Sequence, residues 1–144
     1  MADEFTIDEP DMTTAPGAGP AEILDLTRQL LTAIANGDWR TYERLCAADI
    51  TCFEPEARGH LVEGLPFHQF YFNLGGHIGP LQTTLAAPKV RMLGPDAALI
   101  AYVRLVQAVG GDGQPGVRAS EETRLWQRVG GAWKHVHFHR SPAP

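Results

Sequence analysis

The chain has 144 residues, of which 44% are hydrophobic and 20% are charged, as is ordinary for one globular domain. Its formal charge of −5 comes from the first eleven residues, because residues 21–144 carry 12 basic and 12 acidic side chains. This balance leaves no basic surface for a nucleic acid, and the 2 cysteines are too few for a disulfide framework.

Residues 1–20 are acidic and then rich in Thr, Ala, Gly and Pro, without apolar periodicity. Such a composition buries too little surface to offset the entropy of ordering, so we predict a flexible acidic tail before a domain at 21–144. The N-terminus is acidic where a signal peptide is basic, and no apolar run is long enough to span a bilayer. We therefore expect a cytoplasmic protein that does not bind a membrane.

Three helices are predicted in the first half of the chain. The first has apolar residues at intervals of three and four: Ile23, Leu26, Leu30, Leu31 and Ile34. Asn36-Gly37 supplies its stop signal, and Asp38 is suited to cap a second, shorter helix. Ile50–Phe53 and His60–Val62 are predicted to be short strands, and the aromatic segment Leu65–Leu74 a third helix.

The second half is predicted to consist of long strands joined by short turns rich in glycine. These strands are Leu81–Leu93, Ala97–Val109, Val117–Val129 and Ala132–Arg140. Strands that follow one another through short turns form an antiparallel meander. Helices followed by a meander predict an α+β domain in which the helices cover one face of a curved sheet.

The strand Ala97–Val109 is apolar on both of its sides. Alternation divides it into two sets: Ile100, Tyr102, Arg104 and Val106 on one side, and Leu99, Ala101, Val103 and Leu105 on the other. Helices can cover only one of these faces, so the other is expected to contact a partner subunit. The pattern therefore favours a homo-oligomer.

Three arginines lie in strands at positions that could belong to the core: Arg104, Arg124 and Arg140. A buried guanidinium is costly unless it is paired. If the three side chains converge, they would form a cationic pocket suited to a carboxylate. Alternatively, each arginine pairs with a nearby acid or reaches solvent; the candidate acids are Glu121, Glu122, Glu54 and Glu56.

The last predicted strand carries three alternating histidines: His135, His137 and His139. Alternation would place all three on one face, about 6.8 Å apart. An HxH pair can bind zinc, but nothing nearby in the sequence completes such a site, so core or interface histidines are the preferred interpretation. We expect no metal site and no cofactor.

An enzymatic role receives little support from motifs. The sequence has no GxSxG, GxxxxGK, HExxH, HRD or DFG pattern. His68 is the best single acid/base candidate, although a histidine on a helix face is more often structural. We therefore expect a protein that is not an enzyme.

Several ordered motifs between residue 21 and the end resemble the association domain of calcium/calmodulin-dependent protein kinase type II. They are Asn36-Gly37-Asp38, TCFEPE at 51–56, GHLVEGL at 59–65, FHQFYF at 67–72, IAYVR at 100–104, SEETRLW at 120–126 and VHFHRS at 136–141. The resemblance implies the cone-shaped fold of the nuclear transport factor 2-like superfamily, with three helices on a strongly curved, mainly antiparallel sheet. It also implies a free-standing, self-associating hub without a kinase domain, as a homodimer or a ring of dimers.

The same family binds small carboxylates such as γ-hydroxybutyrate. Its pocket residues correspond to His68, Arg104, Arg124 and Arg140, so the resemblance favours convergence of the three arginines. The loop at 73–80 is shorter than in the family and lacks its tryptophan, which leaves the identity of the ligand open. The alternative function is a cone-pocket enzyme of the isomerase, dehydratase or cyclase type, in which His68 or Glu122 would transfer a proton.

Overall fold

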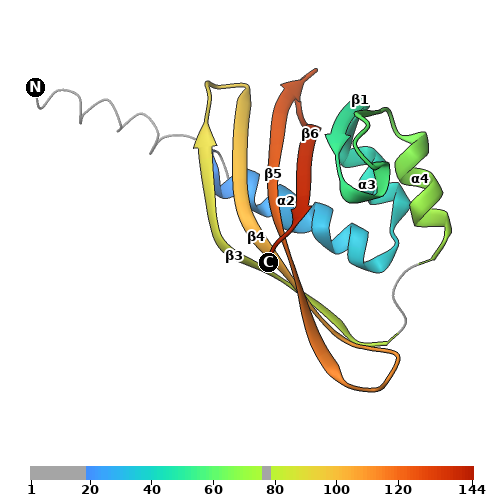
Figure 1. Ribbon diagram of the computed structural model, residues 1–144. Coiled ribbons are helices and arrows are strands. Elements are labelled where there is room, and N and C mark those ends of the chain that lie inside the picture. Colours follow the sequence, from blue (N-terminus) through green and yellow to red (C-terminus); the bar gives the residue numbers. More distant parts are fainter. Residues whose placement is uncertain (1–18, 76–78) are drawn as a thin grey trace, which may run out of the picture.

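The computed structural model describes residues 19–75 and 79–144 (Figure 1). The helices of this part are α2 (Pro20–Asn36), α3 (Trp39–Leu45), the 3-10 helix η1 (Pro55–Ala57) and α4 (Pro66–Asn73). The strands are β1 (Cys46–Phe53), β2 (Val62–Glu63), β3 (Leu81–Met92), β4 (Ala97–Val109), β5 (Pro115–Val129) and β6 (Ala132–Pro142). The predicted α+β class, with three α-helices before a meander, is confirmed.

The predicted tail lies outside the described residues except for its last two positions. Pro20 is already the first residue of α2, where its fixed φ suits the first turn. None of the helices in the described residues is long and apolar enough to cross a membrane.

The turn between α2 and α3 follows the predicted signals. Gly37 ends α2 in the left-handed conformation at φ 67°, which glycine adopts without a Cβ penalty. The Asp38 side chain then accepts a 3.2 Å hydrogen bond from the Thr41 backbone N–H and so caps α3. The two helices are therefore joined by a turn of two residues.

The sheet has the strand order β2-β1-β6-β5-β4-β3. The strands from β3 to β6 form the predicted antiparallel meander, with Ala97 opposite Gln127 and Ser120 opposite Pro142. β1 lies parallel to β6, and β2 is antiparallel to β1. The meander thus continues into the early strands, so β5 and β6 lie in the middle of the sheet.

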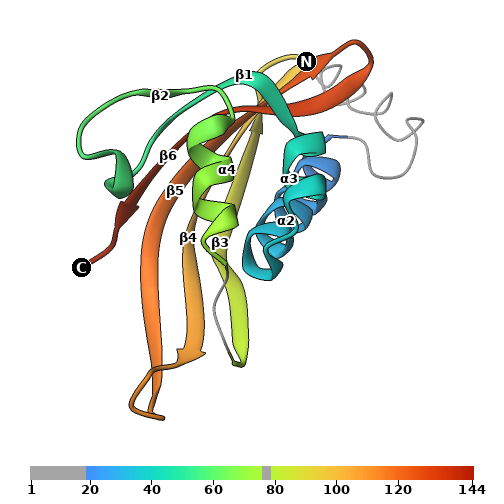
Figure 2. The same ribbon diagram turned by 90° about the vertical axis from the view of Figure 1, so that its right-hand side faces the viewer.

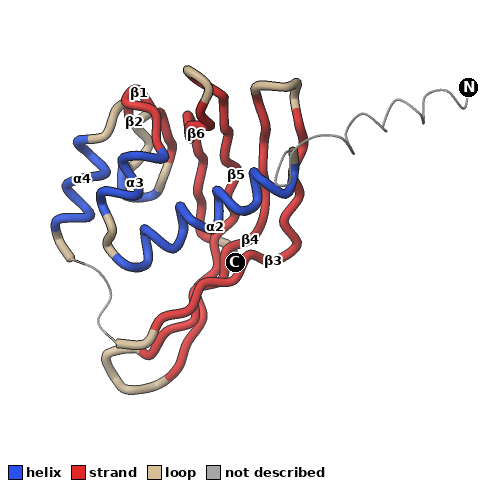
Figure 3. The backbone as a smooth tube through the Cα atoms, turned by 180° about the vertical axis from the view of Figure 1, so that it is seen from behind, coloured by secondary structure: helices blue, strands red, loops and turns tan. Residues whose placement is uncertain are grey.

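The helices lie on one side of the curved sheet (Figure 2). α2 crosses β3 and β4, and the Trp126 indole N–H donates a 3.1 Å hydrogen bond from β5 to Thr27 of α2 (Figure 3). The buried hydrophobic core between these layers consists of Ile23, Leu30, Leu31, Ala33, Tyr42, Leu45, Cys46, Ile50, Cys52, Ala57, Val62, Ala98, Ile100, Tyr102, Trp126, Trp133 and Phe138.

The opposite face of β4 and β5, which we call the outer face, carries half-buried apolar side chains: Leu99, Ala101, Val103, Leu105 and Leu125. No helix of the described residues covers them (Figures 1 and 2). Ile100 and Tyr102, by contrast, are buried under the helices. The predicted two-faced apolar character of β4 is therefore confirmed.

The prediction that the three histidines of β6 share one face is wrong. A β-bulge shifts the register between β5 and β6, so that Leu125 pairs with His137 and Trp126 with His135. The extra residue reverses the alternation. His135 is consequently buried in the core beside Phe138, whereas His137 and His139 lie against the Phe53 ring.

Candidate functional site

An ion pair on β5, formed by Glu122 and Arg124, lies at the centre of the site. Residues two apart on a strand project to the same face, and both side chains are buried, with residue exposures of 2% and 1%. Arg124 Nη2 lies 2.8 Å from Glu122 Oε1, and Arg124 Nε donates a 2.7 Å hydrogen bond to the Tyr102 hydroxyl. That hydroxyl donates to Glu122 Oε1, also at 2.7 Å. The three groups form a closed network that compensates the buried charges.

Arg104 joins this network from β4. Its Nε lies 3.5 Å from Glu122 Oε2, which also accepts a 2.8 Å hydrogen bond from the Ser120 hydroxyl. Within the described residues, Arg104 Nε is a buried donor without a hydrogen-bond partner. Burial by itself would raise the pKa of Glu122, but Arg124 and Arg104, with two hydrogen bonds, lower it to about 2. Glu122 is therefore an ionised carboxylate shared by two arginines.

The other donors of Arg124 point toward β6. Its Nη1 lies 3.4 Å from His135 Nε2, and its guanidinium carbon lies 4.5 Å from the centre of the Phe138 ring. Burial, together with Arg124, lowers the pKa of His135 well below its ordinary value. His135 is thus a neutral core histidine, whose Nδ1 lies 3.5 Å from Cys46 Sγ.

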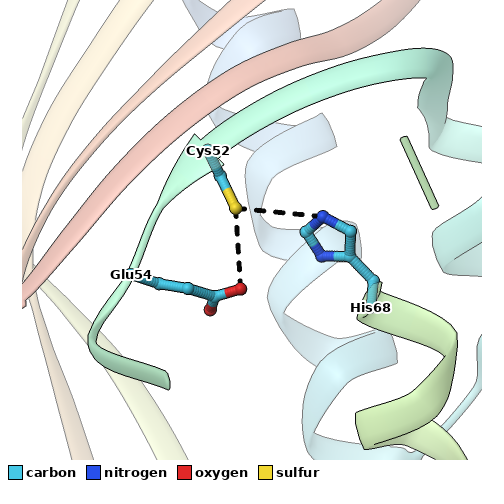
Figure 4. A group of neighbouring side chains, drawn as sticks. All are labelled: Cys52, Glu54 and His68. Atoms are coloured by element: carbon cyan, nitrogen blue, oxygen red, sulfur yellow. Dashed lines mark hydrogen bonds between the residues drawn. The ribbon is translucent and has the colours of Figure 1, made fainter. Parts of the chain in front are cut away.

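His68 reaches the site from α4 and is 5% exposed. Its Nδ1 lies 3.2 Å from the buried Tyr42 hydroxyl, and its Nε2 lies 3.9 Å from Cys52 Sγ. Cys52 in turn lies 3.5 Å from Glu54 Oε2, so three side chains from β1, the following loop and α4 meet (Figure 4). Burial, and secondarily Arg124, lowers the pKa of His68 to about 4. The imidazole is therefore neutral at neutral pH.

Arg140 lies at the rim of the site, near the end of β6. Its Nη2 donates a 3.1 Å hydrogen bond to Glu54 Oε1 and also contacts the Glu56 carboxylate. Burial lowers the pKa of the guanidinium, but the bonds to Glu56 and Glu54 outweigh this effect and raise it. Arg140 is therefore held by two acids of the β1–β2 connection.

The structure thus places the four predicted residues in two groups, each connected internally by polar contacts. Arg104 and Arg124 share Glu122, while His68 is connected to Arg140 through Cys52 and Glu54. Each arginine has an acidic partner, which was one of the two interpretations left open by strand periodicity.

Two residues of the network could not be assigned from the sequence. Tyr102 lies directly opposite Glu122 in the β4–β5 register, but this pairing is known only once the turn length between the strands is known. Cys52 entered the sequence analysis only as one of 2 cysteines, and its neighbours Glu54 and His68 come from separate elements.

The helices on one side of a curved sheet give this chain the nuclear transport factor 2-like fold. A superfamily protein of that description from Salmonella enterica has the same fold, with a TM-score of 0.69 at 21% identity over 85% of this chain and 89% of that one. The sequence model of the calcium/calmodulin-dependent protein kinase II association domain matches residues 19–144. The chain belongs to this family.

Relatives within the family are much more similar in sequence. The delta subunit of calcium/calmodulin-dependent protein kinase type II from Oryctolagus cuniculus is 47% identical over 141 residues, which are 96% of this chain and 26% of the subunit. The chain therefore spans about a quarter of the length of that kinase subunit. The association domain from C. elegans has a TM-score of 0.79 at 46% identity, over 83% of this chain and 92% of that one. The hub homology domain from Chlamydamonas reinhardtii has a TM-score of 0.81 at 45% identity, over 86% of this chain and 98% of that one.

Proposed function

We propose that this domain is a self-associating hub whose copies meet through the outer face of the sheet. Its relatives include proteins named as association and hub domains of the kinase, which supports assembly as the role of the family. The observation that carries the proposal is the apolar outer face of β4 and β5. Burying that face against another copy would remove it from water, which is the main favourable term in association.

The register describes how this face is built. Leu99 lies opposite Leu125, which lies opposite His137, so this row is apolar on β4 and β5 and ends in a histidine on β6. Ala101, Thr123 and His139 form the next row. A shallow hollow of about 410 Å³ lies over β5 and β6 and is lined by Glu121, Thr123, Leu125, His137, His139 and Ser141. An apolar stripe beside a polar rim has the composition of a subunit interface.

The solution mass of the full-length protein, measured by light scattering, tests assembly. We expect a dimer or a larger ring for the natural chain and a smaller species for Leu125→Asp, which puts a charge in the middle of the stripe. Val129→Asp is the matched control, because Val129 is 51% exposed at the end of β5, away from the stripe. A monomeric natural chain would overturn the proposal, and an unchanged mass for Leu125→Asp would exclude this face.

We further propose that His68, Arg104, Arg124 and Arg140 line a site for a small carboxylate. Two of these arginines share one carboxylate, Glu122, so their group retains a net positive charge in a buried setting. Arg124 already bonds to Tyr102, Glu122 and His135, whereas Arg104 Nε finds no hydrogen-bond acceptor among residues 19–75 and 79–144. An anion bound at Arg104 would neutralise the remaining positive charge of the two arginines and would accept a hydrogen bond from Arg104 Nε.

Calorimetric titration with γ-hydroxybutyrate tests this site. Arg104→Met keeps the length of the side chain but removes the donor, so binding should weaken at least tenfold. Arg118→Met is the matched control on an exposed position of β5. Equal affinities for the two variants would contradict the proposed role of Arg104. Arg124→Ala is the less selective variant, because it also leaves Glu122 without its closest cationic partner.

Binding, rather than turnover, is the function that this geometry supports. A general base works best with a pKa near the operating pH. The pKa of Glu122 is lowered to about 2 and that of His68 to about 4, chiefly by neighbouring arginines and by burial, respectively. Both groups are therefore weak bases at neutral pH, which disfavours the cone-pocket enzyme as the alternative.

A further inference from the structure

The side chains of Cys52, Glu54 and His68 meet at the end of β1, facing α4 (Figure 4). The Cys52 sulfur lies 3.5 Å from Glu54 Oε2 and 3.9 Å from His68 Nε2, and the three atoms all lie within 4.8 Å of one another. Cys52 and His68 are buried, and the Glu54 side chain is 12% exposed. A thiol, an imidazole and a carboxylate are the three kinds of side chain that bind zinc.

The two distances from the Cys52 sulfur are close to those between zinc ligands. Zn–S bonds of about 2.3 Å and Zn–N or Zn–O bonds of about 2.1 Å at tetrahedral angles place a sulfur about 3.6 Å from the other ligand atoms. The observed 3.5 Å and 3.9 Å from Cys52 lie close to this value. Glu54 Oε2 and His68 Nε2 lie within 4.8 Å of each other, and a zinc ion that contacts both would bring them to about 3.4 Å.

Neighbouring residues orient two of the three side chains. The Tyr42 hydroxyl lies 3.2 Å from His68 Nδ1, so Nε2 is the nitrogen that faces Cys52. Arg140 holds Glu54 through Oε1, which leaves Oε2 for an ion. Histidine ligands of zinc are usually fixed by a hydrogen bond at the other ring nitrogen.

The charges of the group also suit a divalent cation. A ligating imidazole must be neutral, and His68 can bind through Nε2 because its Nδ1 faces the Tyr42 hydroxyl. A thiolate and a carboxylate together would cancel the two charges of Zn²⁺. Arg124 lies close enough to influence His68, but its guanidinium is bonded directly to Glu122 at 2.8 Å.

A Cys–His–Glu arrangement can also suggest a catalytic nucleophile, but the environment argues against it. Burial, followed by the Glu54 charge, raises the pKa of the Cys52 thiol well above its ordinary value. Reactive cysteines have lowered pKa values and a histidine that accepts the proton. Zn²⁺ would convert the Cys52 thiol to a thiolate, because binding of the metal displaces the thiol proton.

We propose that Cys52, Glu54 and His68 bind Zn²⁺ with three protein ligands and a fourth position open to water or an added ligand. This inference goes beyond the hub function, and it requires neither self-association nor carboxylate binding. In the zinc-bound form, the Cys52 proton is released to solvent, and His68 Nδ1 carries a proton that it donates to the Tyr42 hydroxyl. Binding of one Zn²⁺ therefore releases one proton, that of the Cys52 thiol.

Cobalt substitution on the untagged, full-length, metal-free protein tests the site. Tetrahedral Co²⁺ bound to a thiolate gives intense visible bands and a sulfur-to-metal charge-transfer band. We expect these bands at one equivalent of Co²⁺ and their loss on addition of Zn²⁺. Cys52→Ala should abolish the charge-transfer band, whereas Cys46→Ala, which removes the other buried thiol, should keep it.

Calorimetry with Zn²⁺ supplies the affinities. We expect Cys52→Ala and His68→Gln to bind at least about 100-fold more weakly, since loss of a direct ligand exceeds the 10–100-fold effect of outer residues. Tyr42→Phe should fall in that smaller range. Glu54→Gln, at a partly exposed position, provides a ligand variant should a core substitution unfold the domain.

Absence of the charge-transfer band from the natural protein would overturn the proposal. Zinc binding that is equally strong in Cys52→Ala would also overturn it, because it would show an adventitious ion only, held by exposed side chains such as His60 and His139. A rise in Tm with Zn²⁺ in the natural protein and not in Cys52→Ala would agree with the site.

Discussion

Tyr102 and Glu122 lie directly opposite each other on β4 and β5, and the Tyr102 hydroxyl donates a 2.7 Å hydrogen bond to the Glu122 carboxylate. The same hydroxyl accepts a hydrogen bond from Arg124 Nε. Tyr102 therefore links the two members of an ion pair that is almost completely removed from water. Burial raises its pKa to about 12, so it remains a neutral donor. The stability of the domain should depend on this network.

Glu122→Gln should destabilise the fold strongly. The substitution keeps the shape of the side chain but leaves the buried Arg124 without its compensating charge, and breaking a buried pair in this way costs about 3–5 kcal/mol. Urea unfolding followed by circular dichroism measures the difference. Glu43→Gln is the matched control, because Glu43 is exposed on α3, away from both the network and the outer face, and its loss should change stability by less than about 0.5 kcal/mol. Equal losses in the two variants would contradict the central role of the network.

Acid should destabilise the domain through His68. Its pKa is lowered to about 4 by burial, whereas in the unfolded chain it is 6.5, so the unfolded chain binds more protons between these values. The stability that His68 contributes is therefore fully present above pH 6.5 and is lost as the pH falls toward 4. The contribution of His68 between pH 7.5 and 5 is about 2 kcal/mol.

Urea unfolding at pH 7.5 and pH 5, with EDTA present, measures this dependence. His68→Gln should reduce the difference between the two pH values by about 2 kcal/mol, because glutamine does not titrate. His60→Gln, at an exposed loop position, should leave the difference unchanged. If His68→Gln keeps the full pH dependence, burial of His68 does not cause it.

The sequence predicted most of the fold, because its signals there are local. Gly37 and Asp38 mark a helix end and a helix cap by their own backbone and side-chain preferences. The glycine-rich turns mark the meander for the same reason. The three arginines were recognised as unusual, but whether they face each other or an acid depends on the register between strands.

The remaining features depend on contacts between distant parts of the chain. The bulge that turns His135 away from His137 is one added residue, which alternation alone does not reveal. The parallel pairing of β1 with β6 joins residues almost ninety positions apart. The meeting of Cys52 with His68 follows from that pairing and from the position of α4, so residue spacing could not predict it.

Gly37→Ala should destabilise the domain by about 1 kcal/mol. Gly37 has φ 67°, and a Cβ added there meets no atom within 4 Å, so the cost arises from backbone strain and not from a clash. Gly116→Ala is the matched control, since Gly116 is equally open but is not in the left-handed region. Thermal unfolding of both variants tests this distinction, and a loss in Gly116→Ala as large as in Gly37→Ala would refute it.

Thr27→Val should weaken the attachment of α2 to the sheet. The Thr27 hydroxyl is fully buried, donates a 2.9 Å hydrogen bond to the Ile23 carbonyl and accepts the Trp126 indole N–H at 3.1 Å. Valine has nearly the same shape but cannot accept, so the indole N–H would be buried without a partner. An unsatisfied buried donor costs about 1–3 kcal/mol. The loss should appear in urea unfolding and as faster hydrogen exchange in α2.

Thr32→Val is the control for this last substitution. Thr32 lies on the same helix but is exposed, so the change in helix propensity is the same while no buried hydrogen bond is lost. Trp126→Phe in the Thr27→Val background separates the hydrogen bond from the packing. If the unsatisfied indole N–H causes the destabilisation, Thr27→Val should cost less in that background than in the natural chain. An equal cost in both backgrounds would assign the effect to packing around Thr27 instead.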